Sequence, residues 1–111
     1  MVNEFEKQIK RGMLDIIILN MLTQKPCHGY ELLQEIKRSS QIFESLKEGT
    51  LYPRLYRLLD NECIEFNLAV DEKKSKVKKI YNITKKGKIQ LEELLKIWDM
   101  FVEDMSSVLG R

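Results

Sequence analysis

The chain has 111 residues, of which 32% are charged and 43% hydrophobic, and its formal net charge is +2. This length allows one domain with a modest core, and the composition excludes a disordered or polybasic chain. The longest apolar run, residues 16–19, is far shorter than the roughly 20 residues that span a bilayer. Residues 1–11 lack the apolar stretch of a secretion signal, so we expect a cytoplasmic protein without membrane contact.

Few residues are suited to catalysis or metal binding. His28 is the only histidine, so the usual metal cluster cannot be assembled. Cys27 and Cys63 are expected to be reduced thiols, and a disulfide between them is the alternative. The sequence has neither a glycine-rich phosphate loop nor a serine-histidine-aspartate set. It therefore predicts no enzyme, no cofactor and no metal site.

Two helices are predicted in the first forty residues. Residues 13–22 are apolar nearly all round, which indicates a helix covered on more than one side, and polar residues before them extend it backwards. Asp15 lies within this apolar stretch, so we expect it to pair with a polar or basic group of the fold. The pattern breaks at residues 25–29, where His28 is expected as a turn or cap residue. A second helix follows with a predicted buried stripe of Tyr30, Leu32, Leu33 and Ile36.

The third predicted helix spans residues 49–60. Its leucines at 51, 55, 58 and 59 share one face, and Thr50, Pro53 and Arg57 lie on the other with Arg54 at the edge. Because a helix tolerates proline in its first turn, Pro53 is expected to mark the start near Gly49 or Thr50. A polar first turn bearing arginine is typical of a recognition helix in a DNA groove. The segment alone also fits an ordinary amphipathic surface helix.

A hairpin and a long helix complete the chain. Residues 64–69 alternate apolar and polar side chains, as a half-buried strand does, and residues 77–84 form a second strand after a charged turn. Residues 71–88 hold eight lysines against two acids, which suggests a face for nucleic acid. Thr84 is expected to cap the last helix, whose apolar residues step by four and three. The predicted interface with a second copy of the chain consists of Leu91, Leu95, Trp98, Val102, Met105 and Leu109.

Together these elements predict an α+β, mostly α fold, the winged helix-turn-helix of three helices and a β-hairpin wing, followed by a long dimerisation helix. We expect residues 1–84 to form the DNA-binding domain and residues 85–111 the dimerisation helix, in one compact unit. The predicted DNA-binding residues are Lys47, Thr50, Tyr52, Pro53, Arg54, Arg57, Lys74, Lys76, Lys78 and Lys79. For Tyr52 partial packing in the core is the alternative, and for the lysines a merely soluble, charged hairpin.

The sequence resembles the PadR-type transcriptional regulators, in the short form with a single C-terminal helix, over about residues 10–107. The resemblance is carried by residues 11–15, by Pro-Cys-His-Gly-Tyr-Glu at 26–31, by Glu-Gly-Thr-Leu-Tyr-Pro at 48–53 and by residues 79–87. It implies a homodimeric winged-helix repressor, with the C-terminal helix forming most of the dimer interface. Two-fold symmetry then predicts an inverted-repeat operator in double-stranded DNA. One departure is the wing tip, where the family often has Gly-Gly-Arg-Arg and this chain has Lys-Lys-Ser-Lys-Val at 73–77, without the planar fork of arginine.

The resemblance also implies a response to drugs or phenolic compounds. Short-form members that respond to drugs carry a tryptophan in the last helix, lining a cavity at the dimer centre where planar aromatic molecules stack. Trp98 matches that position, and packing in the dimer core is the alternative role for its side chain. A different class of function also fits the sequence, namely a winged-helix module for protein assembly that uses its acidic last helix for docking and reads no DNA sequence.

Overall fold

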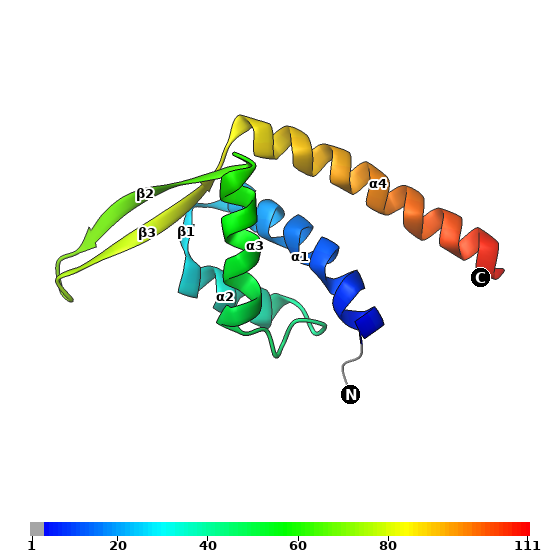
Figure 1. Cartoon of the computed structure of the whole chain (residues 1–111), viewed down its shortest axis with the longest axis horizontal. Coiled ribbons are helices and arrows are strands. Elements are labelled where there is room, and N and C mark those ends of the chain that lie inside the picture. The colour runs from blue at the N-terminus through cyan, green and yellow to red at the C-terminus, as the bar shows by residue number, and fades with distance from the viewer. Residues whose placement is uncertain (1–3) are drawn as a thin grey trace.

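A computed structural model describes residues 4–111 (Figure 1). The elements in chain order are α1 (Glu4–Gln24), β1 (Cys27–His28), α2 (Gly29–Ser39), α3 (Glu48–Asp60), β2 (Ile64–Asp71), β3 (Lys76–Ile83) and α4 (Lys85–Leu109). Three helices, a hairpin and a long last helix are the order predicted from the sequence. The short strand β1 was not predicted. Figure 1 shows the hairpin and α4 projecting from opposite sides of the helical core.

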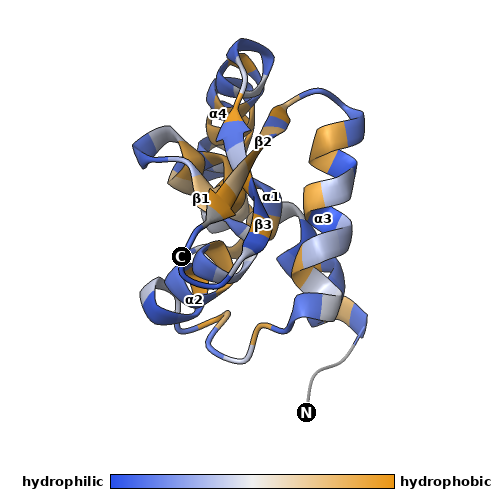
Figure 2. Cartoon of the chain, turned by 90° about the vertical axis from the view of Figure 1, so that its left-hand side faces the viewer, coloured by the Kyte–Doolittle hydropathy of each residue, from blue (hydrophilic) through white to orange (hydrophobic). Residues whose placement is uncertain are grey.

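The sheet is antiparallel, with strand order β1-β3-β2. β1 joins through the pairs Cys27↔Tyr81 and His28↔Ile80, so the segment between α1 and α2 is fastened to the base of the hairpin. β2 and β3 pair along their whole length, from Ile64↔Ile83 to Asp71↔Lys76. Figure 2, which shows the molecule from the side on which the hairpin projects, has hydrophobic and hydrophilic residues interspersed along these strands.

The core lies where α1 meets the other elements. α1 contacts α2, α3, α4 and β3, which explains why its sequence is apolar on nearly every side. Apolar residues of the helices and of the segment between α2 and α3 make up most of the core, and the largest fully buried side chains are those of Leu14, Ile18, Leu19, Leu32, Ile36, Leu51, Leu55 and Ile64.

Side chains cap two helices as the sequence predicts. His28 accepts a hydrogen bond at Nδ1 from the Glu31 N–H (3.1 Å) and so caps α2. Thr84 Oγ1 accepts from the Gly87 N–H (3.0 Å) at the start of α4 and donates to the Glu62 carbonyl (2.7 Å). Each cap satisfies an N–H that a helix start leaves unpaired. The Thr84 bonds also tie α4 to the end of α3.

Two predictions of burial are wrong in part. In α2, Leu32, Leu33 and Ile36 are buried, but Tyr30 is 58% exposed because it lies on the outer face of the first turn. In β2, the alternation correctly separates two faces, yet Leu68 is 66% exposed. The hairpin extends beyond the helices, so only its base reaches the core.

Candidate nucleic-acid interface

α3 divides into a buried face and an exposed face. Leu51, Leu55 and Leu58 are buried, at 0%, 0% and 5% exposure. Thr50, Pro53 and Arg57 are exposed, as is Lys47 directly before the helix. The leucines pack in or against the core, so α3 offers solvent a face with an arginine, a threonine and the ring of Tyr56, which is 49% exposed. This is the division that the leucine spacing predicts.

Pro53 lies deeper in α3 than predicted. The helix begins at Glu48, which makes Pro53 its sixth residue rather than a residue of the first turn. Because proline has no N–H, the Gly49 carbonyl receives no hydrogen bond from four residues ahead. Gly49 itself is exposed. The N–H groups of Thr50 and Leu51 both donate to the Lys47 carbonyl, at 3.0 and 3.1 Å.

Arg54 is paired inside the subunit. Its Nε donates to Asp15 Oδ1 at 2.7 Å and its terminal nitrogen to Oδ2 at 2.5 Å, a two-point pair between α3 and α1. Both side chains are 18% exposed. This confirms the expectation that Asp15 has a partner within the fold. A DNA role for Arg54 stays a prediction, but its fork of donors is already engaged.

Tyr52 is packed against the core, in agreement with the alternative stated for it. The centre of its ring lies 6.1 Å from that of Tyr56. The pKa of the Tyr52 hydroxyl is raised, chiefly by burial. A Cβ added at Gly29 would overlap the Tyr52 hydroxyl. The glycine at the start of α2 therefore makes room for Tyr52, which helps to fix the angle between the two helices.

The wing lysines are spread over both faces of the hairpin. Lys76 and Lys78 share one face, because residues two apart on a strand point the same way. Lys79 lies on the other face, where its Nζ is 4.7 Å from the centre of the Phe66 ring. Lys74 is exposed in the turn. A single flat surface therefore cannot contact all four lysines.

α4 exposes a long apolar stripe. Leu95 and Trp98 are each 38% exposed, and Val102, Met105 and Leu109 are 49%, 54% and 53% exposed. Leu91, predicted for the same interface, is only 6% exposed because it packs into the subunit's own core. The available stripe thus begins one turn later than the sequence predicts.

Sequence reasoning missed an apolar surface at the start of α1. Phe5 is 77% exposed and Ile9 64% exposed. The signal was present in the sequence, as two large apolar residues four apart in a mixed-charge helix start. α1 and α4 are neighbours in the fold, and the subunit leaves these two apolar side chains of α1 uncovered.

Nothing in the described residues indicates catalysis or a metal. Across residues 4–111 no three histidine, cysteine or acidic side chains come together as metal ligands. Both cysteines are free and buried, and burial, helped by nearby Glu31, raises the pKa of the Cys27 thiol. A buried protonated thiol is a poor nucleophile. None of the described helices is long and apolar enough to cross a membrane.

Comparison with known proteins agrees with this geometry. Residues 18–93 match the family model described as the transcriptional regulator PadR-like family. The negative transcriptional regulator PadR of Bacillus subtilis is 31% identical over 83 residues, which are 75% of this chain and 45% of that protein.

Solved structures give the same result over most of the chain. A PadR-like regulator from Bacillus cereus superposes with a TM-score of 0.78 at 32% identity, covering 94% of this chain and 98% of that one. A PadR family regulator from Clostridium difficile gives 0.76 at 32% identity, covering 87% and 98%.

Proposed function

We propose a function for this chain from its family: it belongs to the PadR-like family of DNA-binding transcriptional regulators. Members of this family are regulators and not enzymes. The proposal is that this chain is a homodimeric repressor of an inverted-repeat operator. The repressor role is supported by the relative in Bacillus subtilis, which is named a negative regulator. The observation that carries the proposal is the outer face of α3, which bears Thr50 and Arg57 while Leu51, Leu55 and Leu58 are buried in the core.

In the proposed complex α3 lies in a major groove. Arg57 is its exposed arginine, and arginine to guanine is the commonest specific base contact. Lys47 and Thr50 at the start of α3 contact phosphate, where the helix dipole favours negative charge. Pro53 packs against the backbone of the DNA. Arg54 and Tyr52 act from within, by fixing α3 on α1 and α2.

The wing supplies contacts that do not depend on sequence. In the proposed complex Lys74, Lys76 and Lys78 contact flanking phosphates, and such contacts add affinity and salt dependence but little sequence information. Lys79 contributes positive charge from the opposite face of the hairpin, above Phe66.

The dimer forms through α4, with residues 1–84 as the DNA-binding part and residues 85–111 as the dimerisation helix. Support comes from the exposed apolar stripe from Leu95 to Leu109, since one small subunit has no means of covering it. Phe5 and Ile9 of α1 extend this surface. Two-fold symmetry then places the half-sites one helical turn of DNA, about 10–10.5 base pairs, or a multiple of it apart.

A planar aromatic effector is proposed to bind at the dimer centre against Trp98. The residue is 38% exposed in the subunit and lies on the dimer stripe. An effector shifts the distance between the two α3 helices only if it binds the two arrangements with different affinity. As the sole tryptophan of the chain, Trp98 reports the site by its own fluorescence. Unchanged emission with aromatic cations and phenolic acids would exclude stacking on Trp98.

Fluorescence anisotropy with the DNA upstream of the protein's own gene, against scrambled DNA, tests DNA reading. We expect Arg57→Ala to bring the two affinities together, because it removes a base contact. Lys76→Ala should weaken binding to both DNAs equally. It should also reduce the slope of log affinity against log salt concentration by about one. Arg38→Ala, an exposed arginine on α2, is the control for loss of charge. An equal loss on both DNAs for Arg57→Ala would show that Arg57 reads no base.

A further inference from the structure

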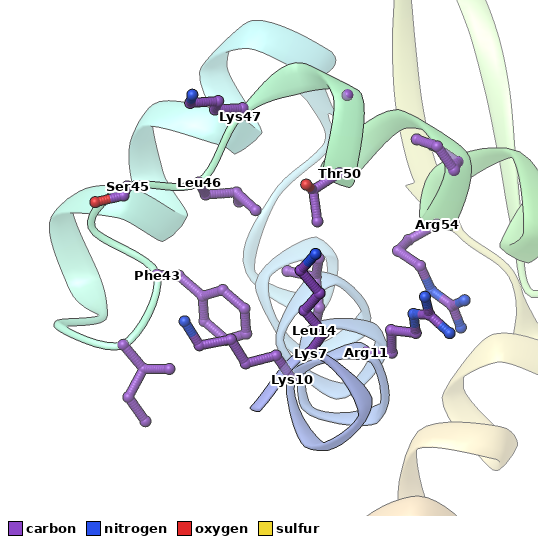
Figure 3. Close-up of a pocket in the computed structure, with 13 residues that line it drawn as sticks. Lys7, Lys10, Arg11, Leu14, Phe43, Ser45, Leu46, Lys47, Thr50 and Arg54 are labelled. Carbon is purple, nitrogen blue, oxygen red and sulfur yellow. The ribbon is translucent and has the colours of Figure 1, made fainter. Parts of the chain in front are cut away.

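A cavity of about 620 Å³ lies between the start of α1, the segment that joins α2 to α3, and the start of α3 (Figure 3). Its volume falls within the roughly 300–1,000 Å³ of small-molecule sites. The proposed DNA contact uses Lys47, Thr50 and Pro53 from its lining, but no function proposed above uses the space between them. The cavity is also separate from Trp98, which is not among its lining residues.

The lining of this cavity combines apolar and cationic side chains. The apolar ones are Leu14, Ile42, Phe43, Leu46 and Pro53, and the cationic ones are Lys7, Lys10, Arg11, Lys47 and Arg54. The remaining lining residues are Ser45, Gly49 and Thr50, so none of the thirteen is acidic. Apolar walls with several cations and no acid suit a molecule with an apolar body and a negatively charged head.

Two of the cations have no carboxylate of their own. Lys7 and Lys10 lie near Glu4 and Glu6 along α1, at 3.7 and 3.1 Å, and Arg54 is held by Asp15. Arg11 and Lys47 make no ion pair within the described part of the chain, and both are exposed. Figure 3 shows Lys47 on the opposite side of the cavity from Arg11. The charge of Arg11 is therefore the one available to the head group of a ligand.

The cavity stays accessible in the proposed dimer. Residues two apart on a helix point to nearly opposite sides, since each residue turns the helix by about 100°. Lys7 lies two residues after Phe5, and Arg11 lies two residues after Ile9. The apolar side of α1 that extends the dimer surface is thus opposite to the side that lines the cavity.

We infer that this cavity binds a carboxylate amphiphile of the fatty-acid type, with its head at Arg11 and its chain over Ile42, a lining residue that is 52% exposed. The cavity borders Gly49, Thr50 and Pro53, in the first two turns of α3. A bound anion there repels DNA phosphate, so ligand and DNA weaken each other's binding by the same factor. This effect on DNA rests on the function proposed above, whereas binding of the ligand does not.

Calorimetric titration of the full chain with decanoate, without DNA, tests the site. We expect one decanoate per subunit and no binding of decyltrimethylammonium, which has an alkyl chain of similar length and the opposite charge. Absence of decanoate binding would overturn the inference and leave the proposed repressor function untouched.

Variants at one position separate charge from shape. Ile42 lines the cavity and is 52% exposed, so substitutions there leave the core intact. Ile42→Glu should abolish decanoate binding by repulsion, and Ile42→Lys should keep it. Arg11→Ala should weaken it roughly tenfold, as loss of a charge-assisted hydrogen bond does, while Arg38→Ala on α2 should change nothing. Equal binding to all four variants would refute the site.

Two further outcomes would place the ligand or the cations elsewhere. Loss of decanoate binding in Trp98→Ala would assign it to the dimer centre and overturn the inference. If Arg11→Ala weakens DNA binding while the unaltered chain binds no decanoate, the cations around the cavity serve DNA contact alone. With the site intact, decanoate should weaken operator binding by the unaltered chain but not by Ile42→Glu.

Discussion

The pair between Asp15 and Arg54 should position α3, and its loss is measurable in both stability and DNA binding. Two charges about 4 Å apart at an effective dielectric of about 20 attract by roughly 4 kcal/mol, and loss of solvation offsets much of this. Because each side chain keeps 18% of its exposure, we expect a net coupling of about 1–2 kcal/mol, between the values for surface and buried pairs. Either single alanine variant should cost about 2–3 kcal/mol, since the other charge is left without its partner.

The assay is a double-mutant cycle of Asp15→Ala and Arg54→Ala by urea unfolding. Protein concentration is held constant, because the stability of the proposed dimer depends on it. Lys7 and Glu4, a 3.7 Å pair at 55% and 79% exposure, provide a control cycle with coupling near zero. Additive effects of Asp15→Ala and Arg54→Ala would refute the stabilising role of their pair.

DNA binding distinguishes positioning from direct contact by Arg54. If Arg54 positions α3, both single variants and the double variant should lower operator affinity by a similar factor. If its guanidinium contacts DNA, Asp15→Ala frees it and removes a negative charge, so affinity should hold or rise while Arg54→Ala lowers it. The second pattern would contradict the positioning role.

Three further results are expected. Gly87→Ala should destabilise the fold by about 1–3 kcal/mol in thermal unfolding, since its Cβ would overlap the Cys63 carbonyl; an unchanged midpoint would show that α4 shifts freely. The Cys27 thiol should react slowly with a thiol reagent at neutral pH and faster only above the usual thiol range, because its raised pKa keeps it protonated; rapid labelling at pH 7 would contradict its burial. Met105→Glu should convert dimer to monomer in sedimentation, as a charge on the α4 stripe opposes its burial, whereas Glu103→Gln should not; an unaltered dimer in Met105→Glu would place the interface elsewhere.

The helices were predictable because their signals are local. Leucine spacing identified the buried face of α3, and the side chains of His28 and Thr84 identified two helix starts. The family motifs led to the correct fold. The position of Pro53 was misjudged because α3 begins at Glu48, where the Lys47 carbonyl accepts the first hydrogen bonds of the helix, and not close to the proline.

The relations between elements were not predictable in the same way. That Asp15 needs a partner follows from its apolar surroundings, but its identity as Arg54, 39 residues away, depends on how α1 and α3 cross. Likewise the alternation in β2 indicates which face is apolar, but not that Leu68 extends beyond the core. The cavity beside α3 is formed by three separate segments, so no stretch of sequence reveals it.

Selection of bound sequences from randomised double-stranded DNA tests the central claim most directly. It assumes no particular target gene, and a symmetric dimer leaves a symmetric record in the selected sequences. The account predicts enrichment of an inverted repeat with half-sites about 10–10.5 base pairs, or a multiple of it, apart. It also predicts affinity at least about 10³-fold above that for random DNA. Recovery of no common sequence from the pool would contradict it.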